Sequence, residues 1–166
     1  MNISTVYQGI LMMEATPTDY NFADVKVMVI DDSKTIRRTA ELILQKAGCQ
    51  VVTAVDGFES LALVVDHKPD IIFVDIMMPR LDGYQTCAVI KHNLVFQSIP
   101  IIMLSSKDGL FDKARGRIVG AEQYLTKPFT GDELLAAIKR YVTKPRQKPA
   151  SPITTGAASN DVVLTG

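Results

Sequence analysis

The chain has 166 residues, of which 47% are hydrophobic, so it can form one folded domain of ordinary size. Its formal net charge of zero gives no reason to expect nucleic acid or an anionic membrane as a partner. Cys49 and Cys87 lie far apart and lack metal-ligand spacing, and no apolar run can span a bilayer or act as a signal peptide. We therefore expect a cytoplasmic protein with free, buried thiols.

The two ends of the chain differ in composition from its middle. Residues 1–24 show no clear periodicity and predict a flexible N-terminal extension. Residues 144–166 are rich in Pro, Ser, Thr, Gly and Ala and predict a disordered tail. Residues 25–143 alternate between strand-like and helical patterns and are expected to form the folded domain.

Five short apolar runs predict strands, at Val25–Ile30, Cys49–Ala54, Ile71–Val74, Pro100–Leu104 and Gln123–Thr126. Each run is followed by a helical pattern, marked by Ile36, Ala40, Ile43 and Ala47, by Phe58, Leu61, Ala62 and Val65, more weakly by Gly83–Asn93, by Phe111, Ala114 and Ile118, and by Leu134, Leu135, Ile138 and Tyr141. Such alternation predicts a doubly wound α/β fold, with a parallel sheet covered by helices on both faces. Ligands of such sheets bind at the carboxyl ends of the strands.

Polar residues follow four of the five predicted strands: Asp31 and Asp32, Asp75, Ser105 and Ser106, and Lys127. Taken singly, acids at these places are often only helix caps, and Asp32 or Ser33 could cap the next helix. Taken together, they predict three carboxylates, two hydroxyls and one ammonium at one edge of the sheet.

Clustered carboxylates repel one another and need a cation, and oxygen ligands without His or Cys indicate Mg²⁺. His67 and His92 fall elsewhere in the pattern and are expected at the surface. A carboxylate such as Asp75, beside a metal and an ammonium, can attack a phosphoryl group and form an acyl phosphate. The turn at Met77–Met78–Pro79 exposes the carbonyl of Met77 as a further candidate metal ligand.

The stretches FVDIMMPRLDGY, PIIMLSS and YLTKPF resemble the bacterial response-regulator receiver domain, which is CheY-like, over about residues 25–142. KVMVIDDSKTIRRTAE, VDIMMPRLDGYQTC and MLSSKDGLFDKARGRIVG look especially similar to the CheY-like regulators of type IV pili and twitching motility. The resemblance implies a flavodoxin-like sheet with strand order 2-1-3-4-5. It also implies a single-domain regulator that accepts a phosphoryl group from a CheA-like histidine kinase and acts on no external substrate.

The same resemblance assigns roles around the acids. It implies that Asp75 is the phosphoacceptor, that Asp32 binds Mg²⁺ directly and Asp31 through water, and that Met77 contributes its carbonyl. Lys127 would pair with the phosphoryl group.

The resemblance also implies a switch beside the acids. Ser105, followed by Ser106, would supply the hydroxyl that moves towards the phosphoryl group, and Tyr124 would be the aromatic switch residue. The peptide before Pro128 is expected to be cis.

Two positions depart from the chemotaxis regulator. Met77 replaces a polar side chain and Lys107 replaces an acid, so fast autodephosphorylation is not expected. The segment with Lys107, Lys113, Arg115 and Arg117 is basic, which indicates either a solvated face or a docking site for an acidic partner. In the family the helix after the fourth strand, the fifth strand and the final helix form the output face, here expected to bind a downstream pilus-regulating protein. The 23 residues after Thr143 are too few for a helix-turn-helix, so we expect output by protein binding rather than DNA binding.

Other functional classes fit the same residues less well. A haloacid-dehalogenase-type phosphatase needs a DxDx[TV] signature after the first strand, where this chain has DDSKT. A flavodoxin-like cofactor binder needs a Ser/Thr/Gly-rich loop there instead of two negative charges. A pseudo-receiver, which binds partners without being phosphorylated, remains the main alternative because the presence of the acids and the lysine does not prove their use.

Overall fold

The computed structural model describes residues 20–106 and 110–143. The predicted extensions therefore fall almost wholly outside the described residues, as do Lys107 and the side chain of Lys113. Among the helices of the described part, none is both long enough and apolar enough to cross a lipid bilayer.

Five parallel strands form one sheet in the order β2-β1-β3-β4-β5, which confirms the predicted doubly wound topology. The strands are β1 (Lys26–Ile30), β2 (Gln50–Ala54), β3 (Ile71–Asp75), β4 (Ile101–Ser105) and β5 (Gln123–Thr126). Every residue of β3 and β4 is buried, as expected for central strands covered on both faces.

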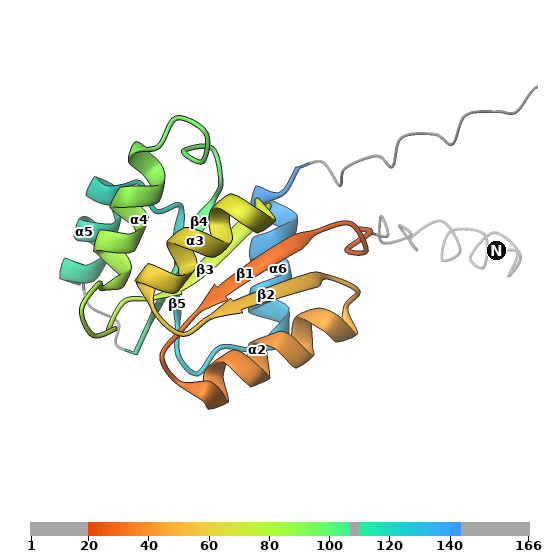
Figure 1. The fold of residues 1–166 in the computed structure, drawn as a ribbon. Helices are drawn as coiled ribbons and strands as arrows, with labels where there is room; N and C mark the ends of the chain where they lie inside the picture. Colours follow the sequence, from red (N-terminus) through yellow and green to blue (C-terminus); the bar gives the residue numbers. More distant parts are fainter. Residues whose placement is uncertain (1–19, 107–109, 144–166) are drawn as a thin grey trace, which may run out of the picture.

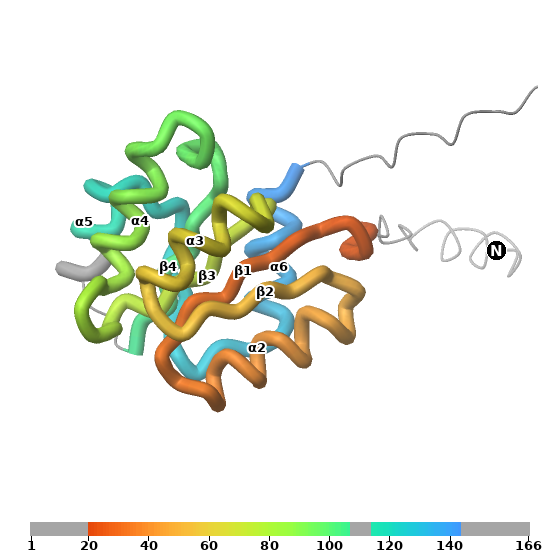
Figure 2. Tube along the Cα trace, in the orientation of Figure 1, coloured from red at the N-terminus to blue at the C-terminus, as the bar shows by residue number. Residues whose placement is uncertain are grey.

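Helices cover both faces of the sheet (Figure 1). They are α2 (Lys34–Lys46), α3 (Gly57–His67), α4 (Gly83–His92), α5 (Leu110–Val119) and α6 (Gly131–Tyr141). Helices α2 and α6 share one core cluster, and α3 and α4 share the other. The tube in Figure 2 shows α3, α4 and α5 together on one side of the strands.

Alternate residues of the central strands feed the two clusters. Val27, Val29 and Phe73 point to the face of α2 and α6, whereas Met28 and Val74 point to the face of α3 and α4. Each face of the sheet is therefore covered by apolar packing, which leaves the carboxyl ends of the strands as the place for polar functional groups.

The predicted strands match the structure to within about one residue at their ends. Asp75 and Ser105 are the last residues of β3 and β4 rather than the first residues after them, because they pair with Leu104 and Thr126 of the neighbouring strands. Their backbones are thus fixed by the sheet itself, not by a loop.

Five residues that the sequence analysis assigned to apolar helix faces are exposed in the structure: Phe58, Ala62 and Val65 of α3, and Ala114 and Ile118 of α5. Phe58 and Val65 of α3 are 54% and 53% exposed, and Ile118 of α5 is 84% exposed. The buried face of α3 is instead formed by Gly57, Ser60 and Val64. The hydroxyl of Ser60 donates to the carbonyl of Gly57 at 2.6 Å, which lets this polar side chain face the core.

Candidate functional site

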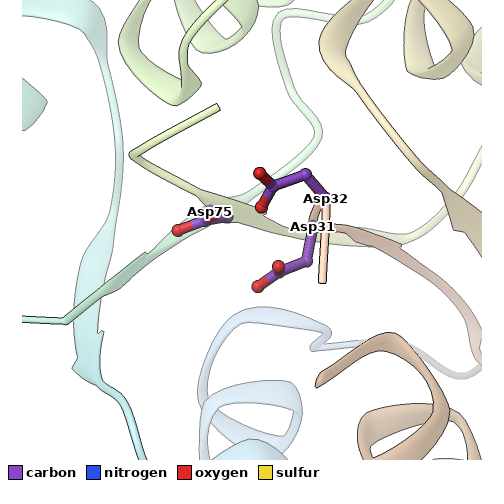
Figure 3. A group of neighbouring side chains, drawn as sticks. All are labelled: Asp31, Asp32 and Asp75. Carbon is purple, nitrogen blue, oxygen red and sulfur yellow. The ribbon is translucent and has the colours of Figure 1, made fainter. Parts of the chain in front are cut away.

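Three carboxylates meet at the carboxyl ends of β1 and β3 (Figure 3). Each of Asp31, Asp32 and Asp75 offers an oxygen that lies within 4.8 Å of the others. Asp31 and Asp75 are buried, whereas Asp32 is exposed. Like charges this close destabilise one another, so the arrangement calls for a cation.

Lys127, which follows β5, brings a positive charge into this cluster. Its ammonium donates to Oδ1 of Asp75 at 2.9 Å and to Oδ2 of Asp31 at 3.1 Å. The Lys127–Pro128 peptide is cis, as the resemblance implied, and the Lys127 amide donates to the carbonyl of Ser105 at 2.6 Å. The structure thus joins residues separated by 96 positions into one polar site.

The turn after β1 is held by its own polar groups. Ser33 caps α2 by accepting from the Ile36 amide, and its own amide donates to Oδ1 of Asp31 at 2.8 Å. Arg37 donates to the carbonyls of Asp31 and Asp32 at 2.7 and 3.1 Å. Because Ser33 is the cap, the side chain of Asp32 is not used for capping and extends towards the other acids.

The start of α4 packs directly against the backbone of the central acid. Asp82 and Gln85 form a capping box, and the amide of Gly83 donates to the carbonyl of Ile76 at 2.9 Å. A Cβ at Gly83 would lie 2.8 Å from the Cα of Ile76 and would overlap the carbonyl oxygen of Asp75. Glycine is needed here because the helix approaches the strand too closely for a side chain.

Burial and neighbouring charges perturb the site in opposing directions. Burial raises the pKa of Asp75, the Lys127 hydrogen bond lowers it, and the Asp31 charge raises it, with a net increase. Burial alone lowers the pKa of Lys127, but its hydrogen bonds to Asp75 and Asp31 outweigh this, so its pKa is raised. The lysine therefore stays charged, and the Asp75 carboxylate is ionised at a cost.

The donor set suits Mg²⁺. All three candidate ligands are carboxylates, and neither His67 nor His92 belongs to the cluster. His92 is exposed as predicted, whereas His67 is half-buried and its carbonyl accepts from the ammonium of Lys26. Met77 is 73% exposed at the mouth of the site, and its amide donates weakly to Oδ1 of Asp75 at 3.4 Å.

The predicted switch residues lie on one face of neighbouring strands. Tyr124 pairs in register with Met103, two residues before Ser105, so both side chains point to the same side of the sheet. Ser105 is buried, Ser106 is exposed and Tyr124 is half-buried. The Tyr124 hydroxyl lies 3.3 Å from that of Tyr84.

Several contacts here escaped the sequence prediction. The guanidinium of Arg115 stacks over the Tyr84 ring at 4.5 Å, and Gly116 leaves room for the Tyr124 ring. Arg80 pairs with Asp56 beside the acidic cluster. None of these pairs has a local spacing signal, since each joins different elements of the fold.

Comparisons with known proteins agree with this architecture. The response regulator receiver domain matches residues 27–139. Protein PilG of Pseudomonas aeruginosa is 73% identical over 118 residues, which cover 71% of this chain and 87% of that protein.

Solved structures give the same result. The chemotaxis protein CheY4 of Vibrio cholerae superposes with a TM-score of 0.68 and 35% identity, covering 70% of this chain and 98% of that one. A putative response regulator from Chloroflexus aurantiacus superposes with a TM-score of 0.69 and 31% identity, covering 72% of this chain and 98% of that one. Matching motifs, strand order and relatives together show that the chain belongs to the response regulator receiver domain family.

Proposed function

We propose that residues 25–143 form a receiver domain in which Asp75 accepts a phosphoryl group, and that the chain signals by binding other proteins. The observation that carries this proposal is the ammonium of Lys127, which contacts both Asp75 and Asp31 at the strand ends. A carboxylate beside a fixed positive charge is suited to attack phosphorus and to hold the product.

The transfer is a displacement at phosphorus. An oxygen of Asp75 forms a bond to phosphorus, and the bond between phosphorus and the donor nitrogen of a phosphohistidine breaks. The electron pair of that bond stays on the imidazole nitrogen of the donor. Lys127, which contacts the Asp75 carboxylate, would pair with a phosphoryl oxygen, and the pairing of Asp75 with Leu104 holds the backbone of the attacking residue in position.

Asp31, Asp32, Asp75 and the Met77 carbonyl would hold Mg²⁺, with Asp32 as a direct ligand and Asp31 acting through water. When bound, the ion supplies positive charge that offsets the negative phosphoryl oxygens. The buried position of Asp31 keeps its carboxylate in place, braced by the Ser33 amide and Lys127.

Phosphorylation would be read out through Ser105 and Tyr124. The new phosphoryl oxygens attract the Ser105 hydroxyl, and its movement opens space for the Tyr124 ring on the same side of the sheet. Ser106, which is exposed beside Ser105, would contact the phosphoryl group from the solvent side.

We propose a CheA-like histidine kinase as the phosphodonor and a downstream pilus-regulating protein as the target, in the cytoplasm. The similarity to PilG and to CheY4 supports a chemosensory role in type IV pilus-dependent twitching motility. The face of α5, β5 and α6, with the exposed Arg115 and Arg117, is the proposed docking surface for that target.

The test is incubation of the protein with acetyl phosphate and Mg²⁺, followed by intact mass measurement. We expect one phosphoryl-sized adduct in the wild type and none in Asp75→Asn, which keeps the shape of the side chain but is a poor nucleophile. Absence of the adduct from the wild type would favour a pseudo-receiver. Equal labelling of Asp75→Asn would show that the acceptor lies elsewhere.

A further inference from the structure

Arg80 links the two loops that lie beside the acidic cluster. Its guanidinium forms an ion pair with Asp56, the residue that caps α3. It also lies over the ring of Phe58 at 5.5 Å from the ring centroid. Arg80 belongs to the β3–α4 loop, whereas Asp56 and Phe58 belong to the start of α3, so the contacts join two segments 24 positions apart.

The backbone of Arg80 is in the left-handed region, with φ of 69°. An arginine adopts this conformation rarely, because its Cβ crowds the backbone there. Surrounding contacts must therefore hold it. Two such contacts are the hydrogen bond from the Leu81 amide to the Pro79 carbonyl, at 2.8 Å across Arg80, and the ion pair of Arg80 with Asp56.

The loop held by Arg80 carries groups of the proposed site. It begins directly after Asp75 and contains Met77, whose amide contacts the Asp75 carboxylate and whose carbonyl is the proposed metal ligand. Leu81, next to Arg80, packs against Gly57 at the start of α3. The β3–α4 loop is thus held at two places: at its beginning by strand β3, and at Arg80 and Leu81 by contacts with the start of α3.

We propose that Arg80 is a positioning residue, which anchors the β3–α4 loop to α3 through Asp56 and Phe58 and thereby holds the Met77 carbonyl in place for the metal. The inference rests on the proposed metal site but goes beyond it, since Arg80 acts through the loop and touches none of the three carboxylates in the contacts that the structure describes.

The alternative to a positioning role is that Arg80 and Asp56 form an ordinary surface ion pair with no effect on the metal site. The chain provides a matched comparison, because Arg38 pairs with Glu41 on the surface of α2. The side chains of Arg80 and Arg38 are similarly exposed, at 65% and 62%. Arg38–Glu41 lies within one helix, however, and joins no separate elements. Removing Arg38 therefore measures the effect of losing an exposed arginine alone.

The experiment measures Mg²⁺ affinity by calorimetric titration on the unphosphorylated protein. We expect Arg80→Asn to weaken binding about three- to tenfold, as for the loss of an outer support of a metal site. Asparagine tolerates the left-handed region, so this variant removes the contacts without adding backbone strain. Asp56→Asn should act in the same direction, because asparagine keeps the helix cap but loses the charge. Arg38→Ala should bind Mg²⁺ as the wild type does.

Two further measurements separate positioning from a general loss of structure. The double variant, Arg80→Asn with Asp56→Asn, should lose no more Mg²⁺ affinity than the weaker-binding of the two single variants, because both substitutions break the same ion pair. The rate of labelling by acetyl phosphate should fall at low Mg²⁺ and recover to within about twofold of the wild type at saturating Mg²⁺.

Wild-type Mg²⁺ affinity in both Arg80→Asn and Asp56→Asn would overturn the proposal. The proposal would also be overturned if the labelling rate stayed low at saturating Mg²⁺ and the melting temperature fell as well, since these results together would indicate a damaged fold. Because Mg²⁺ binding is measured without a phosphodonor, a failure of phosphoryl transfer would leave this test unaffected.

Discussion

Replacing Gly83 by alanine adds one methyl group at the first residue of α4, directly against the backbone of Asp75. The new Cβ would lie 2.8 Å from the Cα of Ile76 and 3.0 Å from the carbonyl carbon of Asp75. Comfortable contacts between carbon atoms begin at about 3.5 Å, and the overlap with the Asp75 carbonyl oxygen is tighter still, so helix and strand must separate by at least about 0.7 Å. Both partners are backbone atoms, so no side chain can turn away.

Overpacking of this kind costs about 1–3 kcal/mol, and alanine returns at most about 1 kcal/mol as a better helix former than glycine. We expect a net loss of about 2 kcal/mol, because rigid backbone puts the cost at the upper end. For a domain of this size the melting temperature should fall by about 8 °C. Since the displaced atoms belong to the attacking residue, labelling by acetyl phosphate should slow about tenfold.

Gly131→Ala is the matched control. Gly131 is also the first residue of a helix that begins with a capping box, but its added Cβ would meet only the Cγ2 of Ile43, at 3.1 Å. The Ile43 methyl group belongs to a side chain and can move away by the few tenths of an ångström that an ordinary contact needs. We therefore expect the melting temperature to change by no more than about 2 °C and the labelling to be unchanged. Thermal denaturation and intact mass would be followed for both variants. If Gly83→Ala melts and labels like Gly131→Ala, the close approach of α4 to Asp75 does not matter.

Three further predictions follow from the site and its surroundings. Burial raises the pKa of Asp75 above its ordinary 3.8, so ionising it costs folded-state stability as pH rises through the raised value. Asp75→Asn should therefore melt higher than the metal-free wild type at pH 7, and this gain should vanish below pH 3.8; equal melting at pH 7 would contradict it. Burial raises the pKa of Cys49 to about 11 and of Cys87 to about 12, so an aromatic disulfide reagent at pH 8 should label neither thiol until denaturant is added. Rapid labelling of the folded protein would show that a thiol is accessible. Ser105→Ala should be phosphorylated normally yet bind the target as weakly as the unphosphorylated protein, and full phosphorylation-dependent binding in a titration would mean that the signal bypasses Ser105.

The sheet could be predicted because its central strands are short, continuous apolar runs, such as IIFV in β3, which alternate with helical patterns as in a parallel sheet covered on both faces. The faces of the helices were harder to predict. In α3 apolar residues surround most of the helix, so periodicity favours Phe58 and Val65 as readily as Val64. The structure buries Gly57 and Ser60 instead, and a Cβ at Gly57 would overlap the side chains of Thr86 and Leu81, so the lack of a side chain there lets α3 approach α4 and the β3–α4 loop closely.

The candidate site was predictable for a topological reason. Parallel strands bring their carboxyl ends to one edge, which unites Asp31, Asp75 and Lys127 whatever their sequence separation. The supporting contacts were not predictable. Arg80 and Asp56 meet only because two loops are adjacent in the fold, and no spacing rule connects residues 24 positions apart.

The described chain begins and ends near the amino ends of the strands, at the side of the domain away from their carboxyl ends (Figure 1). The hydroxyl of Tyr20 donates to the carbonyl of Val142 at 2.7 Å, so the two ends of the domain are hydrogen-bonded neighbours. A short linker from Thr143 to Tyr20 could therefore close the backbone into a ring without distorting it. New termini could then be opened in the turn at residues 93–98, where Leu94 and Val95 are exposed. Such a circular permutant would keep every strand-to-helix turn around Asp75 covalently intact. We therefore expect it to retain the acidic site although its strands and helices follow one another in a different order along the chain.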